Sequence, residues 1–230
     1  MTMVEIPASG MALDAYLALP GTHRAPGVIV IQEWWGLVPH IRTVCDRLAE
    51  EGFVALAPDL YRGAATTEPD EAHKLMMGLK VAQSASDLAA AADYLVRSGC
   101  LPADRVGAMG FCMGGGLALL APTVSPHIDC AMAFYPAMTW PEYHPAWDTY
   151  RGREAVIHQC EADVSSTGPE IARYAAAIAD HGGVAVVETY AGTPHAFFND
   201  ERPETFHAAA SRLAWDRSLA MLHRRLDGPF

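Results

Sequence analysis

Basic residues are scarce in this sequence. Lysine and arginine total 16 against 27 aspartates and glutamates, which gives a formal net charge of −11. Nucleic acids and anionic membranes are bound through a basic surface, so the charge balance argues against both as partners. A small neutral or anionic ligand remains compatible with this balance, because a single arginine can dominate the potential of a pocket.

Long apolar runs and targeting signals are also missing. No apolar run approaches the ~18–20 residues that a membrane-spanning helix needs. Residues 1–10 lack a basic stretch followed by an apolar one, so we expect no signal peptide and a cytoplasmic protein. The five cysteines include no CxxC pair, which argues against a disulfide framework or a zinc site.

Several familiar motifs are absent as well. The sequence has no GxGxxG, no GK[ST] and no HExxH, so we expect neither a cofactor nor a bound metal. It has no internal repeat and no Gly/Ser linker, and 51% of its 230 residues are hydrophobic. We therefore expect one globular domain spanning residues 1–230, with a substantial core, and a monomer as the default state.

Apolar and β-branched segments predict the strands of a sheet. Six nearly continuous runs are typical of parallel strands covered on both faces: residues 27–31, 53–57, 105–109, 129–135, 155–159 and 184–190. Residues 14–19 alternate in polarity and predict an antiparallel edge hairpin with residues 2–6.

Helical patterns separate these runs. The predicted helices are residues 40–51, residues 70–97 as one long or two shorter helices, residues 168–180 and residues 204–226. Residues 136–153 are irregular and aromatic, as in a surface loop or a cap near a site. Alternation of strands and helices predicts the α/β class, with a mainly parallel, doubly wound sheet flanked by helices.

The most informative motif is Gly110-Phe111-Cys112-Met113-Gly114, directly after the predicted strand 105–109. It matches the nucleophile elbow, G-x-S-x-G, with cysteine in place of serine. A tight strand-to-helix turn strains the backbone at the nucleophile, and the helix N-terminus behind it favours a thiolate. The N–H of Met113 would point to where an oxyanion develops. A chance match around an inert buried cysteine is the plainer interpretation.

An acid and a histidine should follow such an elbow, in that order. Asp163 comes after the fifth predicted strand and His195 after the sixth, at the edge where doubly wound sheets build their sites. Asp163 would orient His195, whose other ring nitrogen would face Cys112. Glu161 is the competing acid. Each residue alone is more often a turn or packing residue, but the correct order of all three favours catalysis.

Together these motifs resemble the dienelactone hydrolase family of α/β-hydrolases. The matching segments, which span most of the chain, are Gln32-Glu33-Trp34-Trp35-Gly36, Pro58-Asp59-Leu60-Tyr61, Gly110-Phe111-Cys112-Met113-Gly114-Gly115, Asp163, and His195-Ala196-Phe197-Phe198-Asn199-Asp200 with Arg202-Pro203. The resemblance implies an α/β-hydrolase fold and a hydrolase of small esters or lactones.

The resemblance also implies roles for individual residues. Glu33 would contact Cys112 and accept its proton when substrate binds, and the backbone N–H of Trp34 would be the second oxyanion donor beside Met113. Trp35 and Tyr61 would line the substrate pocket. Without the resemblance, Glu33 would be interpreted as a loop cap and the tryptophans as core or pocket-wall residues.

Two departures from the family pattern bear on the substrate. The founding enzymes hold a dienelactone carboxylate with two arginines. One follows the Leu-Tyr of the second motif, where Arg62 comes one place early, and the other lies four residues after the histidine, where this chain has Asn199. Arg62 is the plausible remaining carboxylate contact, or a solvated loop cation.

The sequence thus predicts a cofactor-free Cys112–His195–Asp163 hydrolase that forms a thioester acyl-enzyme, with the natural ester or lactone open. Two other interpretations stand beside it. Cys112 could be a redox-sensing or peroxide-reactive thiol, because an activated thiol is open to oxidation. Alternatively, the fold could serve as a non-catalytic binding module.

Overall fold

The computed structural model describes residues 1–8, 11–22, 24–138, 140–162 and 168–227. Its centre is an eight-stranded sheet with the strand order β1-β2-β4-β3-β5-β6-β7-β8. The strands are β1 (Thr2–Ala8), β2 (Met11–Ala18), β3 (Gly27–Ile31), β4 (Val54–Pro58), β5 (Val106–Phe111), β6 (Ile128–Phe134), β7 (Glu154–Cys160) and β8 (Val184–Tyr190). Strand β2 is antiparallel to β1 and β4, and the other pairs are parallel, as predicted.

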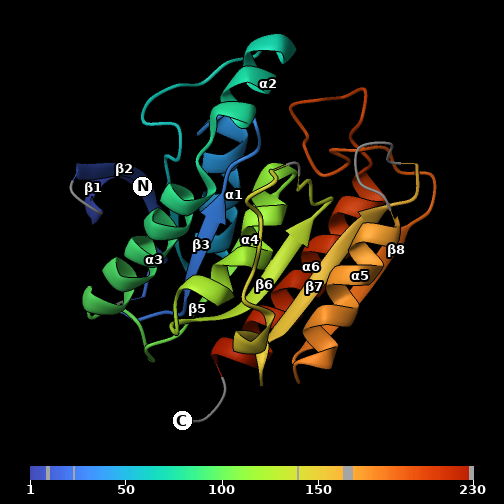
Figure 1. Ribbon diagram of the computed structural model, residues 1–230. Coiled ribbons are helices and arrows are strands. Elements are labelled where there is room, and N and C mark those ends of the chain that lie inside the picture. Colours follow the sequence, from blue (N-terminus) through green and yellow to red (C-terminus); the bar gives the residue numbers. More distant parts are fainter. Residues whose placement is uncertain (9–10, 23, 139, 163–167, 228–230) are drawn as a thin grey trace.

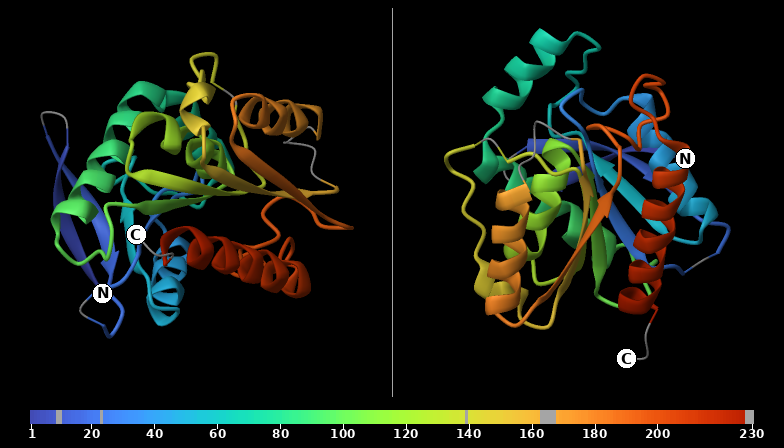
Figure 2. Two further views of the ribbon diagram at one scale, coloured as in Figure 1. Left: turned by 90° about the horizontal axis from the view of Figure 1, so that it is seen from below. Right: turned by 90° about the vertical axis from the view of Figure 1, so that its right-hand side faces the viewer.

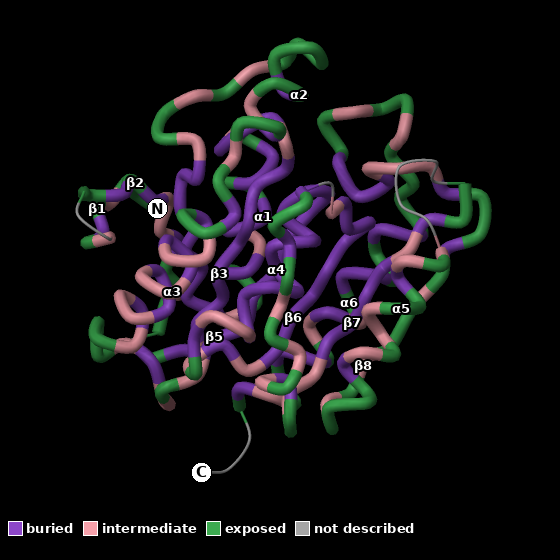
Figure 3. The backbone as a smooth tube through the Cα atoms, in the orientation of Figure 1, coloured by how far each residue is buried: buried purple, intermediate pink, exposed green. Residues whose placement is uncertain are grey.

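Helices cover both faces of this sheet (Figure 2). The helices α1 (Pro39–Glu50) and α6 (Ala208–Leu226) lie on one face, and α3 (Val81–Arg97), α4 (Met113–Val124) and α5 (Gly168–Asp180) lie on the other. Helix α2 (Pro69–Gly78) projects beyond the carboxyl ends of the parallel strands (Figure 1). The central strands β3, β4 and β5 are buried along their whole length, so the core lies on both sides of the sheet (Figure 3).

The structure decides one open alternative and corrects one boundary. The segment 70–97 forms the second of the two predicted alternatives, two shorter helices, because the backbone is extended at Leu79 after Gly78. The last helix begins at Ala208 rather than at residue 204, since successive turns occupy residues 199–206 and the His207 side chain caps the helix by accepting the Ala210 N–H. The expected irregular stretch contains one short 3₁₀ turn, η1 (Trp147–Tyr150).

Strand β8 has the predicted bounds but not the predicted burial. Val184 is 54% exposed and Val186 is 39% exposed, although an apolar run of this kind predicts a strand covered on both faces. The reason is its place in the sheet: within the described part of the chain, β8 is an edge strand that pairs with β7 alone. The local sequence of a strand does not indicate whether that strand lies at the edge or in the centre of the sheet.

Candidate active site

The turn from β5 to α4 places Cys112 in a strained conformation. Its φ is 53°, a left-handed value that few residues other than glycine adopt. A Cβ on Gly110 would lie 1.9 Å from the Gly114 carbonyl oxygen, and one on Gly114 would lie 2.4 Å from the Ile31 carbonyl oxygen. Only glycine fits at these two positions, so the predicted close passage of backbones around Cys112 is confirmed.

Cys112 borders a cavity of about 300 Å³ at the carboxyl ends of the parallel strands. Its side chain is largely buried, 8% of the residue being exposed. The cavity is lined by Glu33, Trp34, Trp35, Met76, Cys112, Ala137, His195, Ala196, Arg202 and Thr205. Five segments separated along the chain thus contribute to one site: the loop after β3, helix α2, the β5–α4 turn, the loop after β6 and the loop after β8.

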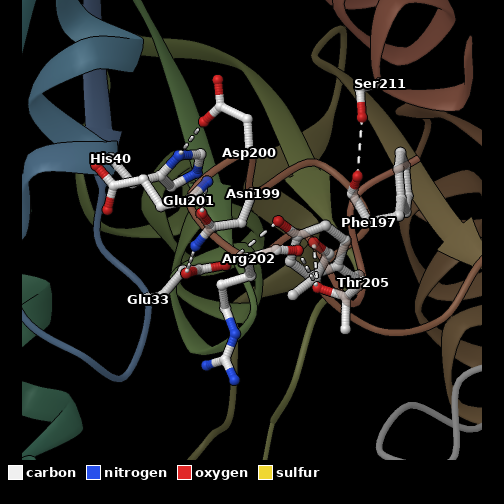
Figure 4. A network of polar contacts seen from close by, with 11 residues as sticks. Glu33, His40, Phe197, Asn199, Asp200, Glu201, Arg202, Thr205 and Ser211 are labelled. Carbon is white, nitrogen blue, oxygen red and sulfur yellow. Dashed lines mark hydrogen bonds and ion pairs between the residues drawn. The ribbon is translucent and has the colours of Figure 1, made fainter. Parts of the chain in front are cut away.

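Glu33 is a buried carboxylate on the wall of this cavity. The Asn199 side-chain amide donates to its Oε2 at 2.9 Å, and the Tyr135 hydroxyl donates to its Oε1 at 3.3 Å (Figure 4 shows Glu33 and Asn199). Both hydrogen-bond donors are neutral groups. Together they give each carboxylate oxygen a partner and fix the orientation of the carboxylate. The glutamate is therefore oriented by side chains that lie 102 and 166 residues away in sequence.

Tyr135 connects Glu33 to the histidine side of the cavity. It follows β6 directly, has a φ of 36°, and its ring centroid lies 4.9 Å from that of His195. Burial, followed by the neighbouring Glu33 and Cys112, raises the pKa of Tyr135 well above its ordinary value. The phenol therefore stays protonated and acts as a hydrogen-bond donor toward Glu33.

The expected acid lies at the edge of what the structure describes. Asp163 is outside the described residues, and Ala162 immediately before it donates its N–H to the Thr193 carbonyl oxygen at 3.1 Å. Glu161, the competing acid, is exposed and its Oε2 accepts the Gly192 N–H at 2.9 Å. The loop that leads into Asp163 thus packs against the loop that leads into His195.

The aromatic residues predicted for the pocket divide into two groups. Trp34 and Trp35 line the cavity, with their ring centroids 4.8 Å apart in an edge-to-face arrangement. Tyr61 is not among the lining residues. Its hydroxyl instead contacts the Sδ of Met113, the first residue of α4, at 3.2 Å. Burial, followed by the neighbouring Cys112, raises the pKa of Tyr61, so it too remains neutral.

Arg62 has a different environment from the one expected. Its guanidinium makes two 2.9 Å hydrogen bonds to the carboxylate of Asp87, a residue of α3 that is itself buried. Arg62 borders a neighbouring surface pocket and not the cavity that contains Cys112. Because removing the arginine would leave a buried charge unpaired, this contact is a structural one. A role for Arg62 in binding substrate stays a prediction.

Three residues of the site had no assigned role in the sequence. Tyr135 and Asn199 hold Glu33, and Arg202 is the cation that lines the cavity. Tyr135 follows a strand at the same sheet edge as Cys112, which is a positional signal that could have singled it out. Arg202 belongs to one of the segments that resemble the family, but its position at the cavity depends on the path of the loop before α6.

Neither a metal site nor a membrane span is found among the described residues. No group of three or more His, Cys, Asp or Glu side chains there could hold a metal ion. No helix in the same ranges is both long enough and apolar enough to cross a bilayer. None of the five cysteines forms a disulfide.

Comparison with known proteins places this geometry in a family. The family model described as "Dienelactone hydrolase family" matches residues 13–226. "Protein usf" of Aquifex pyrophilus is 32% identical over 97% of this chain and 98% of its own length. A "Putative carboxymethylenebutenolidase" of Aquifex aeolicus is 30% identical, covering 93% of this chain and 94% of its own.

Solved structures agree with the sequence comparison. The crystal structure titled "Putative Dienelactone Hydrolase" from Klebsiella pneumoniae superimposes with a TM-score of 0.86 at 28% identity. The match covers 96% of this chain and 97% of that one, and the predicted α/β-hydrolase fold is confirmed. The chain belongs to the dienelactone hydrolase family and is a carboxylic ester hydrolase.

Proposed function

We propose that the protein hydrolyses small esters or lactones with Cys112 as nucleophile, His195 as general base and acid, and Asp163 as the acid that orients the histidine. The observation that carries this proposal is the strained β5–α4 turn, which presents Cys112 to the same cavity as Glu33 and His195. A left-handed non-glycine residue persists only where its surroundings enforce it, and such residues concentrate at functional sites.

The first half of the reaction forms a thioester. Cys112 Sγ attacks the substrate carbonyl carbon while its proton passes to Glu33, and the carbonyl electron pair moves onto oxygen. The backbone N–H groups of Met113 and Trp34 stabilise this oxyanion; Met113 begins α4, whose dipole adds to the effect. The carbonyl then re-forms and the carbon–oxygen bond to the alcohol breaks. His195, which enters this step as the imidazolium, protonates the leaving oxygen and becomes neutral.

The second half regenerates the enzyme. His195 removes a proton from water, and the hydroxide attacks the thioester carbonyl in the same oxyanion site. Collapse of that intermediate breaks the carbon–sulfur bond and releases the acid. Glu33 returns to the thiolate the proton that it took in the first half, and His195 is again the imidazolium. The hydrogen bonds between the loops that carry Asp163 and His195 support the assignment of Asp163 as the orienting acid.

Asn199 and Tyr135 support the role of Glu33 as a proton acceptor. Two neutral donors orient the buried carboxylate without neutralising it, so its negative charge stays available to the thiol. In this chain the position four residues after the histidine therefore serves Glu33. The cavity of about 300 Å³ is at the small end of ligand sites, which favours a short acyl or lactone group.

Aryl-ester hydrolysis tests the proposal. We expect Cys112→Ala and His195→Ala each to lower kcat by at least about 10³-fold, because the nucleophile and its base act as one unit. Cys100→Ala serves as the matched control, because it removes a partly exposed thiol that contacts the Ser98 carbonyl oxygen and does not line the cavity that contains Cys112.

Mass spectrometry adds a direct observation of the intermediate. After rapid acid quench, an acyl group should be found on the peptide that contains Cys112. Hydrolysis at the normal rate in Cys112→Ala would contradict the assignment, and so would acylation of another residue.

A further inference from the structure

A second hollow lies beside the catalytic cavity and shares two side chains with it. This hollow has a volume of about 450 Å³ and is bounded by Val38–Pro39 at the start of α1, Thr66–Thr67 before α2, and Glu201 and Glu204 before α6. Trp35 and Arg202 line both this hollow and the cavity that contains Cys112. We call the second hollow the Trp35 groove. Two adjoining spaces separated by side chains offer room for one extended ligand.

Arg202 is the movable part of the boundary between the two spaces. Its guanidinium carbon lies 4.8 Å from the centroid of the Trp35 ring, and its Nε donates to Glu204 at 3.0 Å. The Arg202 side chain is 36% exposed and that of Glu204 is 60% exposed, so the ion pair between them is weak. A long side chain held by weak contacts can swing aside at small cost.

The walls of the Trp35 groove are held more firmly. The Thr66 N–H donates to the Trp35 carbonyl oxygen at 3.0 Å, which ties the loop before α2 to the loop after β3. On the opposite wall the Glu201 N–H donates to Asn199 Oδ1 at 3.1 Å, and Asn199 in turn bonds Glu33 (Figure 4). The groove therefore exists before any ligand arrives, and a ligand need only displace Arg202.

The lining of the groove has a net negative charge. Glu201 and Glu204 contribute two carboxylates against the single guanidinium of Arg202. The face of Trp35 already carries a cation, which shows that this aromatic surface accepts positive charge. A ligand group with a positive charge is therefore attracted, whereas a carboxylate is repelled.

We propose that the Trp35 groove receives the alcohol portion of a longer ester, that it selects a positively charged portion over a neutral or negative one, and that Arg202 separates it from the catalytic cavity. The inference rests on the proposed function, because it assumes that the ester carbonyl lies at Cys112. In this arrangement the acyl group occupies the catalytic cavity and the alcohol extends past Trp35.

Three acetate esters test the charge selection. Acetylcholine carries a quaternary ammonium, 3,3-dimethylbutyl acetate is its uncharged isostere, and ethyl acetate is too short to enter the groove. We expect kcat/KM, followed by acid release, to be about two- to fivefold higher for acetylcholine than for its isostere, as expected for a partly exposed charge pair. Glu201→Gln should reduce that ratio toward one. Glu5→Gln, an exposed carboxylate on strand β1, should leave it unchanged.

Filling the groove tests its use as a subsite. Thr67→Trp should lower kcat/KM for the two longer esters relative to ethyl acetate by about tenfold or more. An unchanged ratio of long to short esters in Thr67→Trp would overturn the proposal. Equal rates for acetylcholine and its isostere in the wild type would overturn it as well.

Direct binding separates this proposal from the proposed function. Choline, the product, should bind the wild-type protein by calorimetry and bind more weakly to Glu201→Gln, whether or not any ester is turned over. If choline binds in a charge-dependent way but none of the three esters is hydrolysed, the result contradicts the proposed function and leaves the groove proposal standing. If ethyl acetate is hydrolysed but choline does not bind, the result contradicts the groove proposal alone.

Discussion

Two buried ionisable groups, Glu33 and His158, have similar surroundings and different consequences. Each is buried and each makes two hydrogen bonds to side chains from distant elements. Glu33 borders the cavity that contains Cys112, whereas His158 lies in the middle of β7 beneath α6. A buried ionisable group whose hydrogen bonds are all made therefore indicates function only where its side chain also borders a cavity.

The hydrogen bonds of His158 assign its tautomer. The Ser218 hydroxyl donates to the Ala214 carbonyl oxygen, so its oxygen accepts from His158 Nε2–H at 2.9 Å. His158 Nδ1 then accepts from the Tyr190 hydroxyl at 2.8 Å. Burial, with a smaller effect of Arg217, lowers the pKa of His158 to about 3. The imidazole is thus a neutral connector between β7, β8 and α6.

The largest expected effect concerns Glu33. Glu33→Gln keeps the side-chain volume and removes the proton acceptor, so kcat/KM for an aryl ester should fall by about 10²–10⁴-fold. The free energy of unfolding should change by no more than about 1 kcal/mol, because loss of a buried charge offsets one mismatched hydrogen bond. Ester kinetics and urea denaturation of the same preparation measure both. If Glu33→Gln unfolded readily and kept its kcat/KM, Glu33 would be a structural group like His158, and the prediction would be wrong.

His158→Ala should have the opposite profile. It creates a cavity and leaves the Tyr190 hydroxyl and Ser218 Oγ without their partner, which should lower the free energy of unfolding by about 2–4 kcal/mol. At a temperature well below its Tm, the variant should keep kcat/KM within about threefold of the wild type. A large loss of kcat/KM in a folded protein would show that His158 serves the site after all.

Acid should destabilise the protein partly through His158. Below its unfolded-state pKa of about 6.5 the unfolded chain takes up a proton, while the folded imidazole remains neutral down to about pH 3. This group therefore contributes stability that is fully present above pH 6.5 and is lost as pH falls, at up to about 1.4 kcal/mol per pH unit. Denaturation curves at pH 7, 6, 5 and 4 should show a shallower loss in His158→Ala than in the wild type. Parallel losses would refute the assignment.

The smallest expected effect comes from removing one hydrogen-bond donor of Glu33 or of His158. Asn199→Ala removes one of the two donors to Glu33 and should lower kcat/KM by about tenfold, or about 1.4 kcal/mol, with the other donor retained. Tyr190→Phe removes one partner of His158 and is the matched control. It should cost about 1–2 kcal/mol of stability without changing kcat/KM. Equal effects of the two variants on kcat/KM would remove the distinction between the regions.

Much of the fold could be predicted because its signals are local. Each of the six predicted parallel strands is present, with ends that differ by at most one or two residues, since apolar runs bounded by turns depend on neighbouring residues alone. The break at Gly78 was left open between one helix and two, and the start of the last helix was placed four residues too early. Both depend on extended and turn conformations that a helical periodicity does not indicate.

By itself the sequence determined the turn that presents Cys112. Gly110 and Gly114 leave room for the crossing backbones, and that requirement is visible in a five-residue motif. Only the tertiary structure decided which groups surround it. Tyr135 and Asn199 meet at Glu33, Arg62 turns to Asp87, and Arg202 lies over Trp35. These contacts join residues far apart in the chain. The physical reason is that side chains from distant segments become neighbours only when parallel strands bring their carboxyl ends to one edge of the sheet.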